Sequence, residues 1–446
     1  MEALIMAGQL ILSLSILIVL HELGHFLPAK AFKTRVEKFY LFFDPYFSLL
    51  KKKIGETEYG IGWLPLGGYV KISGMVDESM DTEQMNAPPQ PWEFRSKPAW
   101  QRLIIMLGGV TVNAILGIVI YAAVAYAVGE KYLPASEMKY GIVADSLGVK
   151  MGLQTGDKII GYDHQHTFET YSEIPAKIIL DNVLSLQVDR EGKTIDVPVT
   201  DAIRKCWIDS KGEGIYYPAF PAAVGALMPD GALAKAGGKP GDRIIALNGV
   251  TLRYFDEVRI ALRTMKNQQA VVTVLRGRDT VNLNAAIPAT GLLGFSAPDM
   301  ETFFTLKSVQ YNLPQAIGKG FEKAGQTLGA VVKQFRVLFN PEMEGYKHLG
   351  GFMSIGKMYG GTWDWLRFWN MTGLLSIMLA FMNLLPIPAL DGGHVMFTLY
   401  EIITGRKPSD KFLEYAQMVG MVILFSLLIF ANGNDIYKAI VSLINQ

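Results

Sequence analysis

The residues with the clearest chemical potential are His21, Glu22 and His25, which form the pattern HELGH. Two histidines four positions apart lie about 40° apart around a helix, so both imidazoles can bind one metal ion. The glutamate between them has the position of a general base. The spacing therefore predicts a catalytic centre for Zn²⁺, in which Glu22 helps water to attack a peptide bond. A buried hydrogen-bonding role is the alternative for Glu22.

The segment before this motif determines where the chemistry takes place. Residues 3–20 carry no charge and predict a transmembrane helix that brings the motif into the bilayer. The N-terminus lacks the basic region of a cleaved signal peptide, so we expect the helix to be retained.

Two histidines leave a zinc site incomplete, since catalytic zinc usually has three protein ligands. Asp391 lies in a later apolar segment, where a carboxylate costs about 2.5–3.5 kcal/mol on insertion scales unless its charge is compensated. Asp391 is the predicted third ligand, and Gly392 and Gly393 permit close backbone approach. His394 is the rival third ligand, although packing or a hydrogen bond is its expected role.

Pro386 and Pro388 interrupt the same apolar segment and leave backbone carbonyls without helical partners. Irregular backbone at membrane depth is tolerated where it is buried or lines a wet cavity. Both prolines are therefore expected to line the place where a substrate backbone lies. Capping of the broken helix is one role for Asn383, which lies just before them.

Composition and hydropathy predict a multi-span α-helical membrane protein with a large soluble insert. The 446 residues are 50% hydrophobic and 19% charged, with a net charge of +1 and no basic domain, which argues against a nucleic-acid partner. Cys206 is the single cysteine, so no intrachain disulfide can form. Four transmembrane helices are predicted, at 3–28, 103–128, 368–400 and 413–431. Basic loops after the first and third spans predict that both loops are cytoplasmic and that the 129–365 insert faces outward.

The insert contains an internal duplication. Gly156–Ile160 (GDKII) matches Gly241–Ile245 (GDRII), 85 residues later. Both copies resemble the PDZ domain, and Asn248-Gly249 completes that pattern only in the second. We predict two PDZ-like α+β domains at 129–220 and 221–300, followed by an amphipathic connector at 301–365. PDZ domains bind peptide ends by strand addition. The alternative is a spacer that binds nothing.

HExxH at the end of a first helix, combined with NxxPxPxLDGG in a later one, resembles the site-2 protease family of intramembrane zinc metalloproteases. The resemblance covers essentially the whole chain. It implies that His21, His25 and Asp391 bind zinc and that Glu22 is the catalytic base. It also implies that Asn383 holds the substrate backbone.

The resemblance extends to two further segments. Residues 59–72, with Gly67, Gly68 and Tyr69, resemble the family's membrane-associated β-hairpin, expected at about 55–75, which would clamp an extended substrate. Asn113 matches a family asparagine. The family's Gly-Pro pairs read Gly109-Val110 and Gly351-Phe352 here, which leaves the local backbone at both places open.

The implied organisation has two membrane regions. Residues 1–128 hold the first two spans, HExxH and the hairpin, and residues 366–446 hold the last two spans with LDGGH. The resemblance implies a place in the bacterial inner membrane, with the PDZ-like domains on the periplasmic side. It also implies that the substrates are single-span membrane proteins trimmed by another protease, such as an anti-sigma factor in envelope stress, and remnant signal peptides. The rivals are a non-catalytic PDZ receptor and a metal transporter. An intact HExxH argues against the receptor, and the lack of visible membrane repeats argues against the transporter.

Overall fold

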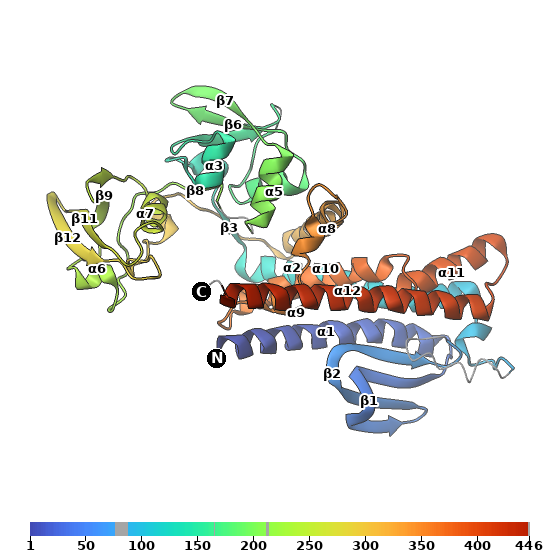
Figure 1. Ribbon diagram of the computed structural model, residues 1–446. Helices are drawn as coiled ribbons and strands as arrows, with labels where there is room; N and C mark the ends of the chain where they lie inside the picture. The colour runs from blue at the N-terminus through green and yellow to red at the C-terminus, as the bar shows by residue number, and fades with distance from the viewer. Residues whose placement is uncertain (76–87, 165, 211–213, 445–446) are drawn as a thin grey trace. The chain divides into compact units, whose positions relative to one another are not determined.

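The computed structural model describes residues 1–75, 88–164, 166–210 and 214–444, and Figure 1 shows its elements. The chain divides into two compact units. The first comprises Met1–Gly129, Gln310–Val332 and Leu349–Gln446, and the second comprises Glu130–Val309 and Lys333–His348.

Long apolar helices dominate the first unit. Within the described ranges, three helices are long and apolar enough to cross a membrane: Glu2–Ala31, Ala99–Val128 and Lys411–Val441. They correspond to three of the four predicted spans, which are thereby confirmed as long apolar helices. The helices of this part of the chain are α1 (Glu2–Ala31), α2 (Ala99–Val128), α10 (Trp365–Leu384), α11 (Asp391–Thr404) and α12 (Asp410–Ile444).

The third predicted span, 368–400, is not one continuous helix, as the two prolines within it predict. It is divided into α10 and α11 by residues 385–390, because Pro386 and Pro388 cannot continue a helical hydrogen-bond ladder. The predicted interruption at the two prolines is confirmed. A Cβ on Gly392 would lie 2.1 Å from the Leu385 carbonyl oxygen, so only glycine lets the loop fold back onto α11.

Small residues let α2 pack directly against its neighbours. A Cβ on Gly108 would lie 1.9 Å from the carbonyl oxygen of Gly24, so the backbones of α1 and α2 are in contact. The buried hydroxyls of Ser13 and Thr372 lie 3.0 Å apart and join α1 to α10. Small residues and interhelical hydrogen bonds are the usual means of helix association in a bilayer.

The strands β1 (Val36–Ile54) and β2 (Thr57–Ile72) form one long, irregular hairpin around a turn at Gly55. Residues 38–41 of β1 lie between two segments of β2, 58–61 and 68–71, and β1 bends back so that 48–54 pairs with 57–62. The predicted hairpin at 55–75 is therefore wrong in extent. Residues 57–72 are a single strand whose partner precedes them, since the turn comes at Gly55 and not within the segment.

The second unit contains two groups of short elements, each with its own hydrophobic core. One core extends from Ile142 to Ile215 and the other from Ala222 to Leu293. The first group contains β4 (Ile142–Ala144), α3 (Ser146–Met151), β5 (Lys158–Tyr162), α4 (Glu173–Leu180), β6 (Ser185–Arg190), β7 (Lys193–Pro198), α5 (Asp201–Asp209) and β8 (Tyr216–Pro218). The second contains α6 (Ala232–Lys235), β9 (Arg243–Leu247), β10 (Val250–Thr251), α7 (Phe255–Leu262), β11 (Gln269–Arg276) and β12 (Asp279–Ala286).

The sheets of the two groups are antiparallel. The first group pairs β4 with β8 and has the order β5-β6-β7, and the second has the order β10-β9-β11-β12. A short pair, β3 (Glu130–Tyr132) with β13 (Lys307–Val309), joins the start and end of this region.

The same buried carboxylate contact occurs in both groups. Asp157 accepts two hydrogen bonds from Arg190, and Asp242 accepts two from Arg276, all at 2.7–2.8 Å. In each group the arginine also donates to a glycine carbonyl, and the aspartate accepts from a backbone N–H three residues before it. The Gly-Asp pair of the repeated motif thus fixes a turn against the strand that carries the arginine.

Two helices follow the short strands in the sequence and precede α10. They are α8 (Leu313–Leu338) and α9 (Phe352–Tyr359). In α8, Leu313, Ile317 and Phe321 are exposed, while Gly320 packs against α2, where a Cβ would lie 2.6 Å from the Ile118 carbonyl oxygen. The carboxylate of Asp435 on α12 accepts hydrogen bonds from the first turn of α9 and holds that turn in place.

Candidate metal centre

Three potential ligand atoms form a nearly equilateral triangle at the end of α1. The Nε2 atoms of His21 and His25 lie 3.2 Å apart, and Asp391 Oδ2 lies 3.3 Å from the first and 3.4 Å from the second. Tetrahedral zinc with bonds of about 2.0–2.1 Å requires ligand separations of about 3.3–3.4 Å. The triangle therefore has the size of one face of a zinc tetrahedron.

The surroundings of the triangle also suit a cation. His25 is buried, and the side chains of His21 and Asp391 are only 13% and 17% exposed. Asp391 Oδ2 is a buried oxygen without a hydrogen bond of standard geometry. A buried acceptor of this kind is costly unless a positive partner compensates it. The donor set and this buried oxygen without a standard hydrogen bond both fit Zn²⁺.

The positions of the ligands follow from local structure. His21 and His25 are one turn apart on α1, so their rings lie on the same side of the helix. Asp391 is the first residue of α11 and follows directly on the loop that the two prolines create. The break between α10 and α11 therefore places the Asp391 carboxylate beside two histidines that are far away in the sequence.

Glu22 lies beside the triangle and against β2. Its carboxylate accepts a hydrogen bond from the Val70 backbone N–H and interacts electrostatically with both histidines and Asp391. Gly68 lies next to it, since a Cβ there would be 2.5 Å from Ile18 Cγ2 and 3.6 Å from Glu22 Cγ. The strand thus passes close enough to touch the predicted base.

The other two predicted residues of β2 hold the sheet together. A Cβ on Gly67 would lie 2.7 Å from the ring of Phe43. The Tyr69 hydroxyl donates to Asp44 at 2.8 Å, and the Tyr69 ring stacks on Tyr40. Of the three, Gly68 is the residue that lies against Glu22.

The structure separates the predicted residues of the broken helix. Asn383 Nδ2 lies 3.3 Å from His21 Nε2, so this amide reaches the triangle. Pro386 is exposed. Pro388 packs on α12, where a Cβ on Gly420 would lie 1.7 Å from the Pro388 carbonyl oxygen.

His394 is not a member of the ligand group found within the described ranges, which is His21, His25 and Asp391. It lines a small cavity of about 40 Å³ together with Phe397 and Gln417.

Helix α2 supplies contacts to the histidines that the motifs did not reveal. The Ile105 carbonyl oxygen lies 2.8 Å from His25 Nδ1, and Asn113 Nδ2 lies 3.2 Å from His21 Nδ1. A Cβ on Gly109 would lie 2.4 Å from His25 Nε2 and 2.6 Å from His21 Cε1. The available signal was the four-residue spacing of these three positions on one side of a predicted helix.

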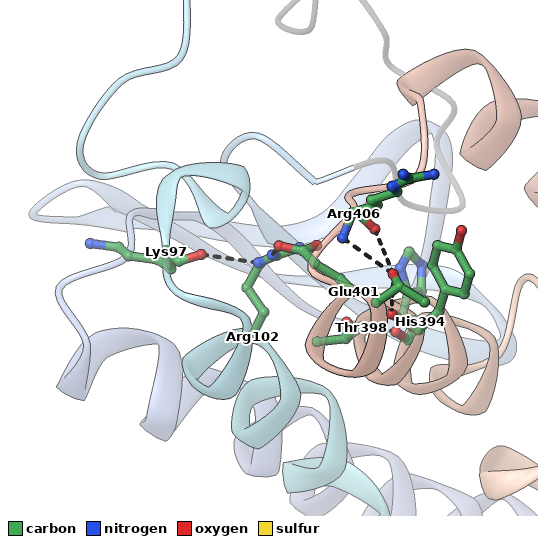
Figure 2. A network of polar contacts seen from close by, with 8 residues as sticks. Lys97, Arg102, His394, Thr398, Glu401 and Arg406 are labelled. Carbon is green, nitrogen blue, oxygen red and sulfur yellow. Dashed lines mark hydrogen bonds and ion pairs between the residues drawn. The ribbon is translucent and has the colours of Figure 1, made fainter.

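A polar network joins the start of α2 to the end of α11, as Figure 2 shows. The Arg102 guanidinium donates to Glu401 at 2.5 Å and to the Lys97 carbonyl at 3.0 Å. Within α11, the Thr398 hydroxyl donates to the His394 carbonyl. This network fixes the position of α11, whose first residue is Asp391.

Comparison with known proteins gives a match over most of the chain. The model of the family described as Peptidase family M50 matches residues 9–427. A Vibrio cholerae protein, provisionally named as a zinc metalloprotease, is 29% identical over 95% of this chain and 97% of its own.

Two relatives carry more specific names. The regulator of sigma E protease of Haemophilus influenzae is 24% identical over 97% of this chain and 98% of its own. The protease RseP of Yersinia pestis is 26% identical over 95% of this chain and 97% of its own. The resemblance seen in the sequence is thereby confirmed. The chain belongs to peptidase family M50, the site-2 proteases, and is a membrane-embedded zinc metalloprotease.

Proposed function

We propose that this protease cleaves peptide bonds within the transmembrane segments of single-span membrane proteins. His21, His25 and Asp391 hold the zinc ion, and Glu22 is the catalytic base. The observation that carries the proposal is the zinc-sized triangle at the end of an apolar helix, with the Glu22 carboxylate beside it.

The chain supplies the proton chemistry through one residue. A bound zinc ion supplies Lewis acidity that polarises the scissile carbonyl and makes water more acidic. Glu22 takes a proton from the attacking water and delivers it to the nitrogen of the leaving amine. The hydrogen bond from the Val70 N–H keeps the Glu22 carboxylate oriented toward the site.

The substrate must become extended before it can be cut, because a transmembrane helix protects its peptide bonds with internal hydrogen bonds. Residues 68–72 of β2 pair on one side with β1, and the N–H of Val70 is directed at Glu22. A substrate strand that adds beside Gly67, Gly68 and Tyr69 would therefore lie next to the base. The amide of Asn383, 3.3 Å from His21, holds the substrate backbone from the other half of the site.

In the membrane arrangement that we propose, α10 is the core of a third span between α2 and α12. Its 20 residues extend about 30 Å, the thickness of the hydrocarbon core. The basic loops that contain 30–53 and 405–411 face the cytoplasm. The insert then lies in the periplasm, and the protein is a four-span protein of a bacterial inner membrane.

The two groups of strands at 129–220 and 221–300 are proposed to be PDZ-like domains that screen substrates, either by binding peptide ends or by excluding bulky ones. The repeated Asp–Arg contact and the two separate cores support a duplicated domain. The 301–365 segment connects them to the membrane helices.

The proposed physiological substrates are membrane proteins already trimmed by another protease. The name of the Haemophilus influenzae relative points to sigma E regulation, so an anti-sigma factor in envelope stress signalling is the first candidate. Remnant signal peptides are the second.

Cleavage of a model single-span substrate by the purified protein in detergent tests the function. We expect Glu22→Gln to abolish the product while zinc remains bound, and a zinc chelator to abolish it in the wild type. Glu2→Gln, at the opposite end of α1, is the matched control and should cleave normally. Equal product from Glu22→Gln would contradict the proposed mechanism and favour the receptor alternative. Zinc flux into vesicles would favour the transporter.

A further inference from the structure

Both histidines of the triangle are contacted from behind by α2, at Nδ1, the ring nitrogen opposite the metal-facing Nε2. The partner of His25 is the backbone carbonyl of Ile105, at 2.8 Å. A carbonyl oxygen can only accept a hydrogen bond, so His25 Nδ1 must carry the proton. In the neutral imidazole, this contact leaves Nε2 with a free lone pair, as a metal ligand requires.

The partner of His21 is the side-chain amide of Asn113, at 3.2 Å. Asn113 is only 1% exposed, and its Oδ1 is buried without a hydrogen bond. If His21 Nε2 binds zinc, its Nδ1 carries a proton and would then face the amide N–H₂, another donor. A half-turn of the amide exchanges oxygen and nitrogen and places an acceptor at Nδ1.

We propose that Asn113 is a positioning residue of the zinc centre. Its Oδ1 accepts a hydrogen bond from His21 Nδ1–H, which fixes the tautomer and the ring orientation that present Nε2 to the metal. The inference rests on the proposed role of His21 as a zinc ligand.

The surroundings of Asn113 keep its amide in place. The buried Ser376 hydroxyl on α10 donates to the Asn113 carbonyl at 2.7 Å and fixes the backbone of this turn. One turn earlier, Gly109 has no side chain where the two imidazoles lie, so α2 can approach them closely. Ile105, Gly109 and Asn113 therefore form one side of α2 that faces the back of the metal centre.

Competition with a zinc chelator of known affinity, applied to the full-length protein in detergent, tests this role without measuring cleavage. We expect Asn113→Leu, which has a similar shape but no acceptor, to weaken zinc binding roughly 10- to 100-fold. Asn113→Asp keeps an acceptor in the same place and should bind zinc at least as tightly as the wild type. Ser13→Ala removes a buried interhelical hydrogen bond away from the centre and is the matched control for stability.

A double-mutant cycle separates positioning from packing or added charge. If Asn113 acts through His21, Asn113→Leu should cost no further affinity in the His21→Ala background but its full cost in the His25→Ala background. An equal loss in both backgrounds, or wild-type affinity of Asn113→Leu, would overturn the inference while leaving the proposed ligands intact. Unchanged zinc affinity of His21→Ala would overturn both the ligand set and the inference.

Discussion

At the scale of single residues, Gly109 lies against both imidazoles of the proposed metal centre although it contributes no ligand. A Cβ there would lie less than 3 Å from atoms of both imidazoles. Contacts this short require a shift of the rings or of the backbone, and overpacking of this kind costs about 1–3 kcal/mol. Any such shift also enlarges or distorts the ligand triangle.

We therefore predict that Gly109→Ala weakens zinc binding about tenfold or more, as measured by chelator competition. Gly8→Ala is the matched control, because Gly8 also lies on an apolar helix but has open space around its Cα. Wild-type zinc affinity of Gly109→Ala would show that the rings can move away without loss.

The residues whose side chains make up the candidate site could be found from the sequence. Those that contribute only backbone or space could not. His21, Glu22, His25 and Asp391 stand in patterns that few other functions require, and the structure brings them together. Ile105 contributes only a backbone carbonyl and Gly109 only the absence of a side chain. No residue pattern specifies such contributions, because they depend on how closely α2 approaches α1.

At the scale of the elements, the ion pair between Arg102 and Glu401 holds α11 against α2 (Figure 2). Both side chains are largely buried, at 9% and 19% exposure. Removal of one partner of a buried pair is strongly destabilising because it leaves an uncompensated charge, whereas an apolar replacement of both is better tolerated.

We predict that Glu401→Leu destabilises the protein by about 3–5 kcal/mol and that the Arg102→Met/Glu401→Leu double variant recovers most of this loss. Equilibrium unfolding in mixed detergent micelles measures the free energies. Glu322→Leu, which removes an exposed ion pair on α8, should cost less than about 1 kcal/mol. A double variant as unstable as Glu401→Leu would mean that the pair itself stabilises the contact.

Hydropathy was sufficient for α1, α2 and α12, where length and composition together determine a helix. Hydropathy was not sufficient where single proline or glycine residues determine the backbone conformation. The prolines after Leu384 end one helix and allow another to begin at Asp391, and the turn at Gly55 determines which strand pairs with β2. Residues 36–54 were predicted only as part of the loop between the first two spans. The aromatic residues of β1 favour a strand there, but hydropathy alone does not detect this preference.

At the scale of the whole molecule, the second unit contains two separately packed cores, each with a buried aspartate bound by an arginine. In the second, the hydrogen bonds from Arg276 lower the pKa of the Asp242 carboxyl below its ordinary value. A carboxyl with a lowered folded pKa contributes stability that is fully present above its unfolded pKa of about 4. This contribution is lost as the pH falls through the folded pKa.

We predict that Asp242→Asn destabilises the second core by about 2 kcal/mol at pH 7, and that the difference from the wild type shrinks as the pH falls below about 4. Hydrogen exchange of the β9 and β11 amides, corrected for the intrinsic pH dependence of exchange, measures the local effect. Asp230→Asn, on an exposed loop, should leave this protection unchanged. Equal protection of Asp242→Asn and the wild type at pH 7 would contradict the prediction.

The two contacts from α2 to the histidines differ in how an amino-acid substitution affects them. His25 is bound by a backbone carbonyl, which is present whatever amino acid occupies position 105. His21 meets a side chain, which every substitution at position 113 replaces. Codon 105 can therefore drift among helix-compatible apolar residues while its contact persists, whereas codon 113 is the place where natural variation can tune the affinity of the centre for its metal.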